Sequence, residues 1–253
     1  LIHMATLVHD DILDHSKTRH DDEALYLKYG IPISVLFGDY LFSKGFSLFS
    51  ESKETVVFSE ASKAVSFLVA GEMRERYQVK NSKITKKEYI TIIKKKSGEL
   101  FGLASKLGAI YSKATRLQMK NAYSFGINSG IAYQILDDCC DYFSIKGHRK
   151  TFHDFSQGVM TLPLIYLLQS CTKKEYTYIT QALTKTSVGP TERIKLRSFL
   201  LKYTIMEKCF ADLEYYLNKA LKLLPSELKS NTAVTPDVIS FIQERVNYVR
   251  KKY

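Results

Sequence analysis

Apolar residues recur along most of the chain at spacings of three and four, and short polar stretches separate these segments. That periodicity predicts helices, because residues three or four apart share one helix face. The segments expected to be helical are 1–13, 33–50, 54–78, 83–111, 116–143, 161–170, 173–184, 190–223 and 235–251. A capping box at Thr85 and Glu88 marks the start of one helix, and Pro163 stands in the first turn of another. No segment alternates apolar and polar residues as a half-buried strand would.

The composition favours the same fold class. The chain has 253 residues with only 12 Gly and 5 Pro, fewer turn-forming residues than an all-β protein of this length needs. Its length suits one large domain with a sizeable core. We therefore predict an all-α protein with a single domain over residues 1–253.

Two acid clusters interrupt this apolar pattern, and they share one spacing. The first comprises Asp10, Asp11 and Asp14, and the second comprises Asp137, Asp138 and Asp141. On a helix the first and last acids of each cluster lie one turn apart on the same face. Carboxylates in this arrangement offer the oxygen ligands that Mg²⁺ prefers, and Mg²⁺ is commonly completed by substrate phosphates. The two clusters predict paired magnesium sites around a diphosphate.

The alternative without a ligand is that each cluster lies at a helix end in contact with solvent. Basic residues follow both clusters, and diphosphate needs cationic partners as well as metal ions. These residues are Lys17 and Arg19 after the first cluster, and Lys146, Arg149 and Lys150 after the second. Their repetition favours the diphosphate hypothesis over two coincidental helix ends.

The segments HMATLVHDDILDHSKTR and GINSGIAYQILDDCCDYF, with TLPLIYLL after them, resemble the trans-isoprenyl (polyprenyl) diphosphate synthase family. FGDYLFSKG, AGEMRE and KKKSGELF fall between them in the family's order. The resemblance extends from residue 1 to about residue 250, and it is strongest to the long-chain type such as heptaprenyl and octaprenyl diphosphate synthases. It implies a single helical bundle around a central cavity, usually dimeric. It also implies Mg²⁺-dependent transfer of an allylic prenyl group onto isopentenyl diphosphate.

The resemblance also implies roles for individual residues. Asp10 and Asp14 would be principal metal ligands with Asp11 in support, and Asp137 would be the main ligand of the second site with Asp138 and Asp141 in support. The catalytic set would be Asp10, Asp14, Lys96 and Asp137. The residues that would contact substrate are Arg19, His20, Lys96, Ser97, Gln134 and, in a register that the sequence leaves open, Arg149 or Lys150.

Several positions depart from the family pattern. His20 stands where the family has a second arginine, and Val159 follows Gly158 where the family has lysine. The family's N-terminal helices, which supply much of the isopentenyl diphosphate site, would lie before residue 1. Ala5 and Thr6, one turn before the first cluster, are small where short-product members carry bulky aromatics. We therefore expect a product longer than C20.

The remaining observations bound partners and location. Four cysteines without ligand spacing, no signal peptide and no apolar run of about 18 residues predict a cytoplasmic protein without a transmembrane segment. Transient membrane contact could accompany product release. A net charge of +11 without a DNA-binding motif favours an anionic small substrate over nucleic acid.

Three alternatives stay open at this point. A homodimer is expected, but the departures also suit a non-catalytic or partner-dependent subunit of a heteromeric synthase. His9 beside Asp10 suits a helical metal-dependent phosphohydrolase, although further His and Asp ligands cannot be placed. Charge alone supports a basic nucleic-acid-binding module.

Overall fold

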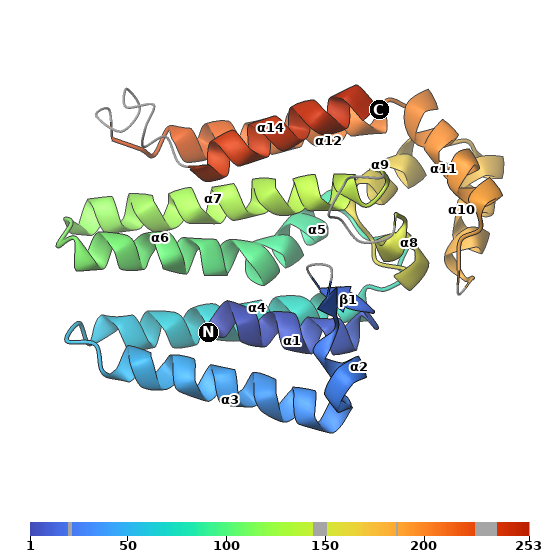
Figure 1. Ribbon diagram of the computed structural model, residues 1–253. Coiled ribbons are helices and arrows are strands. Elements are labelled where there is room, and N and C mark those ends of the chain that lie inside the picture. Colours follow the sequence, from blue (N-terminus) through green and yellow to red (C-terminus); the bar gives the residue numbers. More distant parts are fainter. Residues whose placement is uncertain (20–21, 144–150, 186, 226–236, 253) are drawn as a thin grey trace. The chain divides into compact units, whose positions relative to one another are not determined.

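The computed structural model describes residues 1–19, 22–143, 151–185, 187–225 and 237–252, and most of these are helical (Figure 1). The helices are α1 (Ile2–Leu13), α2 (Leu25–Tyr29), α3 (Ile31–Ser50), α4 (Val56–Tyr77), α5 (Lys86–Ile93), η1 (Lys94–Gly98), α6 (Glu99–Tyr111), α7 (Arg116–Cys140), α8 (His153–Gln157), α9 (Leu162–Ser170), α10 (Lys173–Leu183), α11 (Pro190–Lys202), α12 (Ile205–Leu221) and α14 (Asp237–Lys252). The strands β1 (Thr18–Arg19) and β2 (Asp22–Glu23) pair antiparallel. Among the described helices, none is long and apolar enough to cross a membrane.

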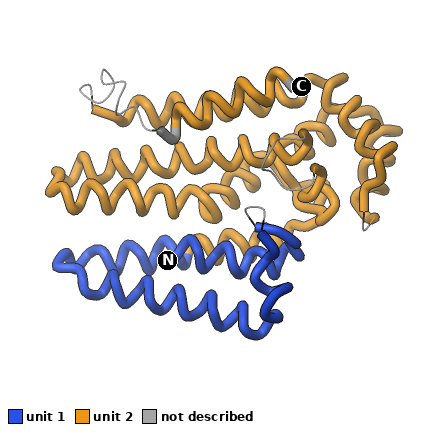
Figure 2. Tube along the Cα trace, viewed as in Figure 1, with its two compact units in different colours: residues 1–66 blue, residues 67–253 orange. Residues whose placement is uncertain are grey.

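The chain divides into two compact units, Leu1–Ser66 and Phe67–Tyr253 (Figure 2). In unit 1, α1 packs on α3 through small residues. A Cβ added to Gly38 would lie 2.2 Å from Nε2 of His9, and one added to Gly45 would lie 2.8 Å from Cδ1 of Ile2. Any larger side chain at these two positions would push the helices apart, so the glycines permit their close contact.

Unit 2 is built around α7, which packs against α6, α9, α12 and α14. Its C-terminal half is almost fully buried and supplies Ile131, Ile135 and Leu136 to the core. η1 approaches α7 closely because Gly130 of α7 meets Gly98, and a Cβ added to Gly130 would lie 2.9 Å from the Gly98 Cα. This core fixes the end of α7 that carries the second acid cluster.

The structure confirms the all-α class and changes some helix boundaries. The segment predicted as one helix over 190–223 is two helices, because Thr204 adopts a left-handed conformation with φ 49° between α11 and α12. The 83–111 segment contains a π-helical turn, η1. The β1–β2 hairpin is too short to show an alternating pattern in the sequence. The single domain over 1–253 stays a prediction, because the chain divides into two compact units.

Candidate functional site

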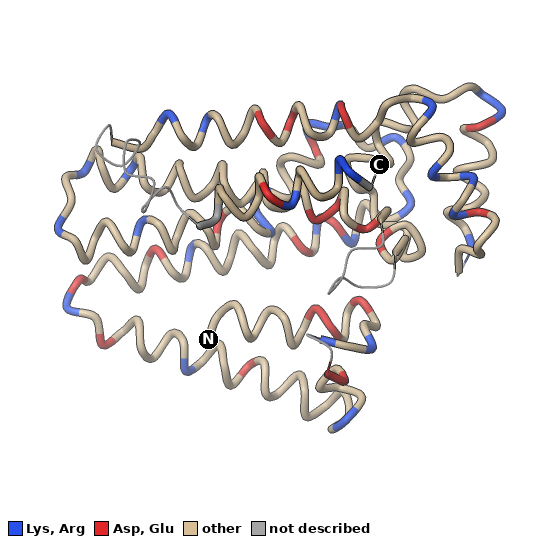
Figure 3. The backbone as a smooth tube through the Cα atoms, turned by 45° about the horizontal axis from the view of Figure 1, so that its top comes forward, with Lys and Arg blue, Asp and Glu red and all other residues tan. Residues whose placement is uncertain are grey.

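Both acid clusters lie at the C-terminal end of a helix. Asp14 caps α1 and donates its backbone N–H to the Asp10 carbonyl, and Asp141 caps α7 with the same bond to the Asp137 carbonyl. Figure 3 shows acidic positions in red where α1 ends. The C-terminal end of a helix carries partial negative charge, so acids there are destabilising unless a cation offsets them. Both clusters do lie at helix ends, as the alternative hypothesis states. The partial negative charge of those ends nevertheless favours binding of a cation there.

In the first cluster, Asp11 is the buried member, with 4% of its surface exposed. The Nε of Arg19, on β1, lies 3.1 and 3.2 Å from the two Asp11 carboxylate oxygens, and Nη2 donates to the same carboxylate. Asp10 and Asp14 are half-buried. The arginine expected to hold a diphosphate therefore also neutralises the buried acid of the cluster.

His9 faces α3. Its Nε2 lies 3.2 Å from the Val35 carbonyl oxygen and 3.5 Å from a carboxylate oxygen of Asp39. Its ring lies 5.7 Å from that of Phe42. These contacts show that the His9 side chain packs against α3. That packing explains its position without the phosphohydrolase hypothesis.

In the second cluster, Asp137 is exposed whereas Asp138 is buried with 4% of its surface exposed. The Tyr89 hydroxyl on α5 donates to one Asp138 oxygen at 2.7 Å, and Nε2 of Gln134 donates to the other at 2.9 Å. Burial, with the nearby charge of Asp154, raises the pKa of Asp138 well above its usual range. Asp137 is thus the acid of this cluster that presents itself to solvent.

Asp141 has a structural partner of its own. Its carboxylate oxygens accept the backbone N–H groups of His153 at 2.9 Å and Asp154 at 3.2 Å, which begin α8. Burial is the main cause that raises the pKa of Asp141, and Asp154 adds to it. The third acid therefore ties the end of α7 to the start of α8.

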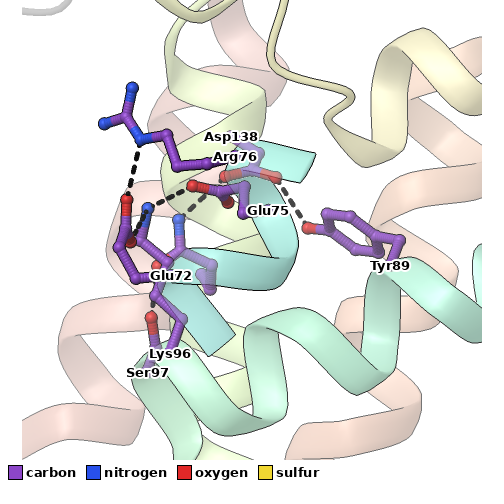
Figure 4. Close-up of polar contacts among 8 residues, drawn as sticks. Glu72, Glu75, Arg76, Tyr89, Lys96, Ser97 and Asp138 are labelled. Atoms are coloured by element: carbon purple, nitrogen blue, oxygen red, sulfur yellow. Dashed lines mark hydrogen bonds and ion pairs between the residues drawn. The ribbon is translucent and has the colours of Figure 1, made fainter. Parts of the chain in front are cut away.

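A chain of hydrogen bonds joins this cluster to η1. The Ser97 hydroxyl donates to Oε1 of Gln134 at 2.5 Å, and the amide of Gln134 continues to Asp138. Figure 4 shows these contacts with the Tyr89 side chain directed at Asp138. The structure thus brings together three residues that the sequence assigned separately, and adds Tyr89.

Lys96 is held by two acids of α4. Its Nζ lies 2.5 Å from Glu75 and 2.9 Å from Glu72, whose other carboxylate oxygen accepts from Arg76 (Figure 4). Gly71 permits this approach, because a Cβ there would lie 2.7 Å from the backbone nitrogen of Lys96. Glu75 therefore pairs with a lysine that is distant in the sequence, although two arginines flank it on α4.

The π-helical turn that carries Lys96 and Ser97 widens the backbone locally, a feature frequent at functional sites. His20, Arg149 and Lys150 lie outside the described residues. Unit 2 carries 31 Lys and Arg against 16 Asp and Glu, whereas residues 1–66 carry six against ten. The basic surplus therefore belongs to the unit with Lys96, which suits an anionic ligand.

Within the described part of the chain, no three His, Cys, Asp or Glu side chains converge to hold a metal ion. The donor set nevertheless fits Mg²⁺, because exposed Asp137 and half-buried Asp10 and Asp14 offer only oxygen. Mg²⁺ is usually bound by one or two carboxylates and completed by water and phosphate. Such sites need no full protein cage.

Sequence reasoning missed Glu72, Tyr89 and Asp154, and it missed the contact between Glu75 and Lys96. Tyr89 follows a helical capping box and has the spacing of an ordinary core aromatic, so nothing local marks its hydroxyl. Glu72 and Glu75 lie one turn apart on α4, which indicates a shared face but not the lysine that they meet. These contacts depend on packing between distant segments.

The polyprenyl synthetase family model matches residues 1–196. The geranylgeranyl diphosphate synthase of Sulfolobus acidocaldarius is 26% identical over 96% of this chain and 76% of its own length. Heptaprenyl diphosphate synthase component 2 of Bacillus subtilis is 30% identical over 88% of this chain. The match covers 64% of that relative, so this chain spans less than two thirds of its length. Among solved structures, this chain is similar to a Caulobacter crescentus polyprenyl synthase complexed with calcium and isoprenyl diphosphate, with a TM-score of 0.86 and 25% identity. The match covers 98% of this chain and 74% of the Caulobacter chain.

Proposed function

Because the chain belongs to the polyprenyl synthetase family, we propose that it is a Mg²⁺-dependent trans-prenyltransferase that elongates an allylic diphosphate with isopentenyl diphosphate. The observation that carries this proposal is the pair of acid clusters, each at a helix C-terminus where a bound cation offsets both the carboxylates and the helix dipole. The calcium and isoprenyl diphosphate of the Caulobacter structure support the ligand class.

In the proposed reaction the allylic C–O bond breaks, and its electron pair leaves with the diphosphate. The double bond of isopentenyl diphosphate then forms the new C–C bond, and a proton is lost to restore a double bond. Bound Mg²⁺ would supply charge stabilisation on the leaving oxygens. Asp10, Asp14 and Asp137 would hold the metal ions. No side chain is assigned as the base, and the departing diphosphate can take the proton.

Lys96 and Arg19 would bind the diphosphate oxygens. Both cations are kept in place by carboxylates, Lys96 by Glu72 and Glu75, and Arg19 by Asp11. An incoming diphosphate adds negative charge that attracts the same cations. The acids therefore orient the two side chains before substrate binds.

The product is proposed to be longer than C20, because the side chains of Ala5 and Thr6, one turn before the first cluster, are small. Ala5 has no exposed surface and Thr6 is buried, its hydroxyl donating to the His3 carbonyl at 2.7 Å. Ala5→Phe should shorten the product by filling space beside the growing tail. Radio-labelled product length is the measurement, with the unfolding temperature recorded because overpacking costs about 1–3 kcal/mol. An unchanged product distribution from a folded variant contradicts this.

A homodimer is proposed through α3. This helix is apolar nearly all round, yet its buried residues in this chain are only Ser34, Gly38 and Gly45. Ile33, Leu36, Phe37, Tyr40 and Leu48 are exposed by 43–63% of their surface. A helix that is apolar on every face is normally covered, so a second protein surface is expected there. Leu36→Glu should yield a monomer in analytical ultracentrifugation.

The second candidate is a partner-dependent subunit, favoured by the "component 2" in the Bacillus relative's name. The purified chain alone, with farnesyl diphosphate, labelled isopentenyl diphosphate and Mg²⁺, separates the two. Turnover that EDTA abolishes supports the stand-alone enzyme. No turnover alone, with turnover restored by a partner subunit, would favour the heteromer.

A further inference from the structure

We propose that Tyr89 is a positioning residue of the second acid cluster. Tyr89 holds the Asp138 carboxyl group in place, and Asp138 in turn orients Gln134 and Ser97. Asp137 is then the metal ligand of that cluster. This inference rests on the proposed function and deepens it. It also assigns Asp138 a task different from the supporting metal ligand that the family resemblance implies.

Both oxygens of the Asp138 carboxylate already have protein partners. Tyr89, with 3% of its surface exposed, donates at 2.7 Å to one oxygen, and Gln134 donates at 2.9 Å to the other. Asp137, on the next position of the same helix, is exposed. Two adjacent acids therefore differ in burial, and Asp137 is the one that lies at the surface, where a metal ion can reach it.

The direction of each hydrogen bond follows from Asp138. Nε2 of Gln134 donates to one oxygen of the Asp138 carboxyl group at 2.9 Å, so the NH₂ end of the amide is directed at Asp138. Its carbonyl oxygen then faces Ser97, at 2.5 Å, and the Ser97 hydroxyl must donate to it. The Tyr89–Asp138 pair thereby sets the orientation of an amide on α7 and a hydroxyl on η1.

The end of this chain lies beside the cationic part of the site. Ser97 follows Lys96 in η1, and Lys96 contacts Glu72 and Glu75. A shift of Ser97 would therefore move the residue expected to bind diphosphate. Groups that orient the ligands of a metal site from behind typically change metal affinity or activity by about 10–100-fold when removed.

The test compares Tyr89→Phe with Tyr166→Phe. Both substitutions remove a phenol that donates to an aspartate, but the partner of Tyr166 is Asp212, which also pairs with Lys86 and has no assigned role in the site. The probe is inorganic pyrophosphate with Mg²⁺, measured by isothermal titration calorimetry, and the Mg²⁺ concentration dependence of condensation is recorded alongside. Unfolding temperatures report on packing.

We expect Tyr89→Phe to weaken magnesium pyrophosphate binding by about tenfold, and Tyr166→Phe to change it by less than about twofold. Asp138→Asn sharpens the test. An Asn amide can keep both contacts only if Gln134 turns round and Ser97 becomes an acceptor, or if Tyr89 becomes an acceptor and its buried O–H loses its partner. It should weaken binding as Tyr89→Phe does, with the protein folded. Wild-type binding by folded Tyr89→Phe, or equal losses in both Tyr variants, would overturn the proposal.

The same data separate this inference from the proposed function. Wild-type protein that binds magnesium pyrophosphate but forms no prenyl product, either alone or with a partner subunit, would refute the prenyltransferase, while the Tyr89→Phe difference would still support the positioning role. Wild-type turnover with an unaffected Tyr89→Phe variant would refute the positioning role alone. Absence of magnesium pyrophosphate binding by wild-type protein would refute both.

Discussion

The two acid clusters have the same spacing and the same place at a helix end, but they are built differently. In both, the second aspartate is buried: Asp11 and Asp138 each expose 4% of their surface. Asp11 is held by a cation, Arg19, whereas Asp138 is held by two neutral donors, Tyr89 and Gln134. The same sequence pattern therefore meets two kinds of environment.

This difference shows how one spacing can serve two tasks. A helix end turns the first and third acids toward one face and the second acid toward the interior. The interior acid then needs a partner, since an unpaired buried charge is costly. In the first cluster the partner is Arg19, which adds a positive charge beside the acids. In the second cluster the partner is Tyr89, which fixes the direction of the hydrogen bonds.

The largest expected effect separates the acids within one cluster. Asp137→Asn should lower the condensation rate by at least about 100-fold, because it removes a metal ligand that stabilises developing charge. Asp138→Asn should lose less, since its carboxylate orients neighbours without contacting metal. Steady-state assays at saturating Mg²⁺ measure both rates. Equal losses from the two variants would erase the distinction drawn here.

The next effect concerns stability and contrasts the two buried acids. Arg19→Gln should lower the free energy of unfolding by about 1–3 kcal/mol, because Asp11 is left buried without its cation. Tyr89→Phe should cost about 1–2 kcal/mol through the loss of one hydrogen bond to Asp138. Urea denaturation at low salt measures both values.

Salt then distinguishes the two mechanisms. Raising NaCl from about 0.1 to 1 M shortens the screening length from about 10 to 3 Å, so the Arg19→Gln deficit should shrink. The Tyr89→Phe deficit should stay nearly constant, because the phenol is neutral. Identical salt responses would mean that the two clusters are held in the same way.

The smallest effect supplies a reference carboxylate outside both clusters. Contacts from Lys202, then Tyr203 and Thr172, lower the pKa of half-buried Glu175 to about 2. Its contribution to stability is present above the unfolded pKa near 4.5 and is lost as pH falls toward 2. Glu175→Gln should therefore be slightly less stable than wild type at pH 7, with the gap closing below pH 4.5. A thermal denaturation series over pH measures this, and a constant gap contradicts it.

The helical class and the location of both acid clusters were predictable because they depend on local periodicity. The pairing of Arg19 with Asp11 was not, since it requires the β1–β2 hairpin, whose two-residue strands leave no alternating signal. The contacts of Lys96 with Glu72 and Glu75 were also not predictable. They depend on a π-helical turn and on Gly71 admitting it, both of which arise from packing between distant segments.

The central claim is that the acid clusters bind metal ions together with diphosphate. Isothermal titration calorimetry of magnesium pyrophosphate with Asp10→Asn, Asp137→Asn and the reference variant Glu175→Gln tests it most directly. Each aspartate variant should bind at least about tenfold more weakly than wild type while remaining folded, because it loses a metal ligand, and Glu175→Gln should bind as wild type does. Wild-type binding by either folded aspartate variant would contradict the claim.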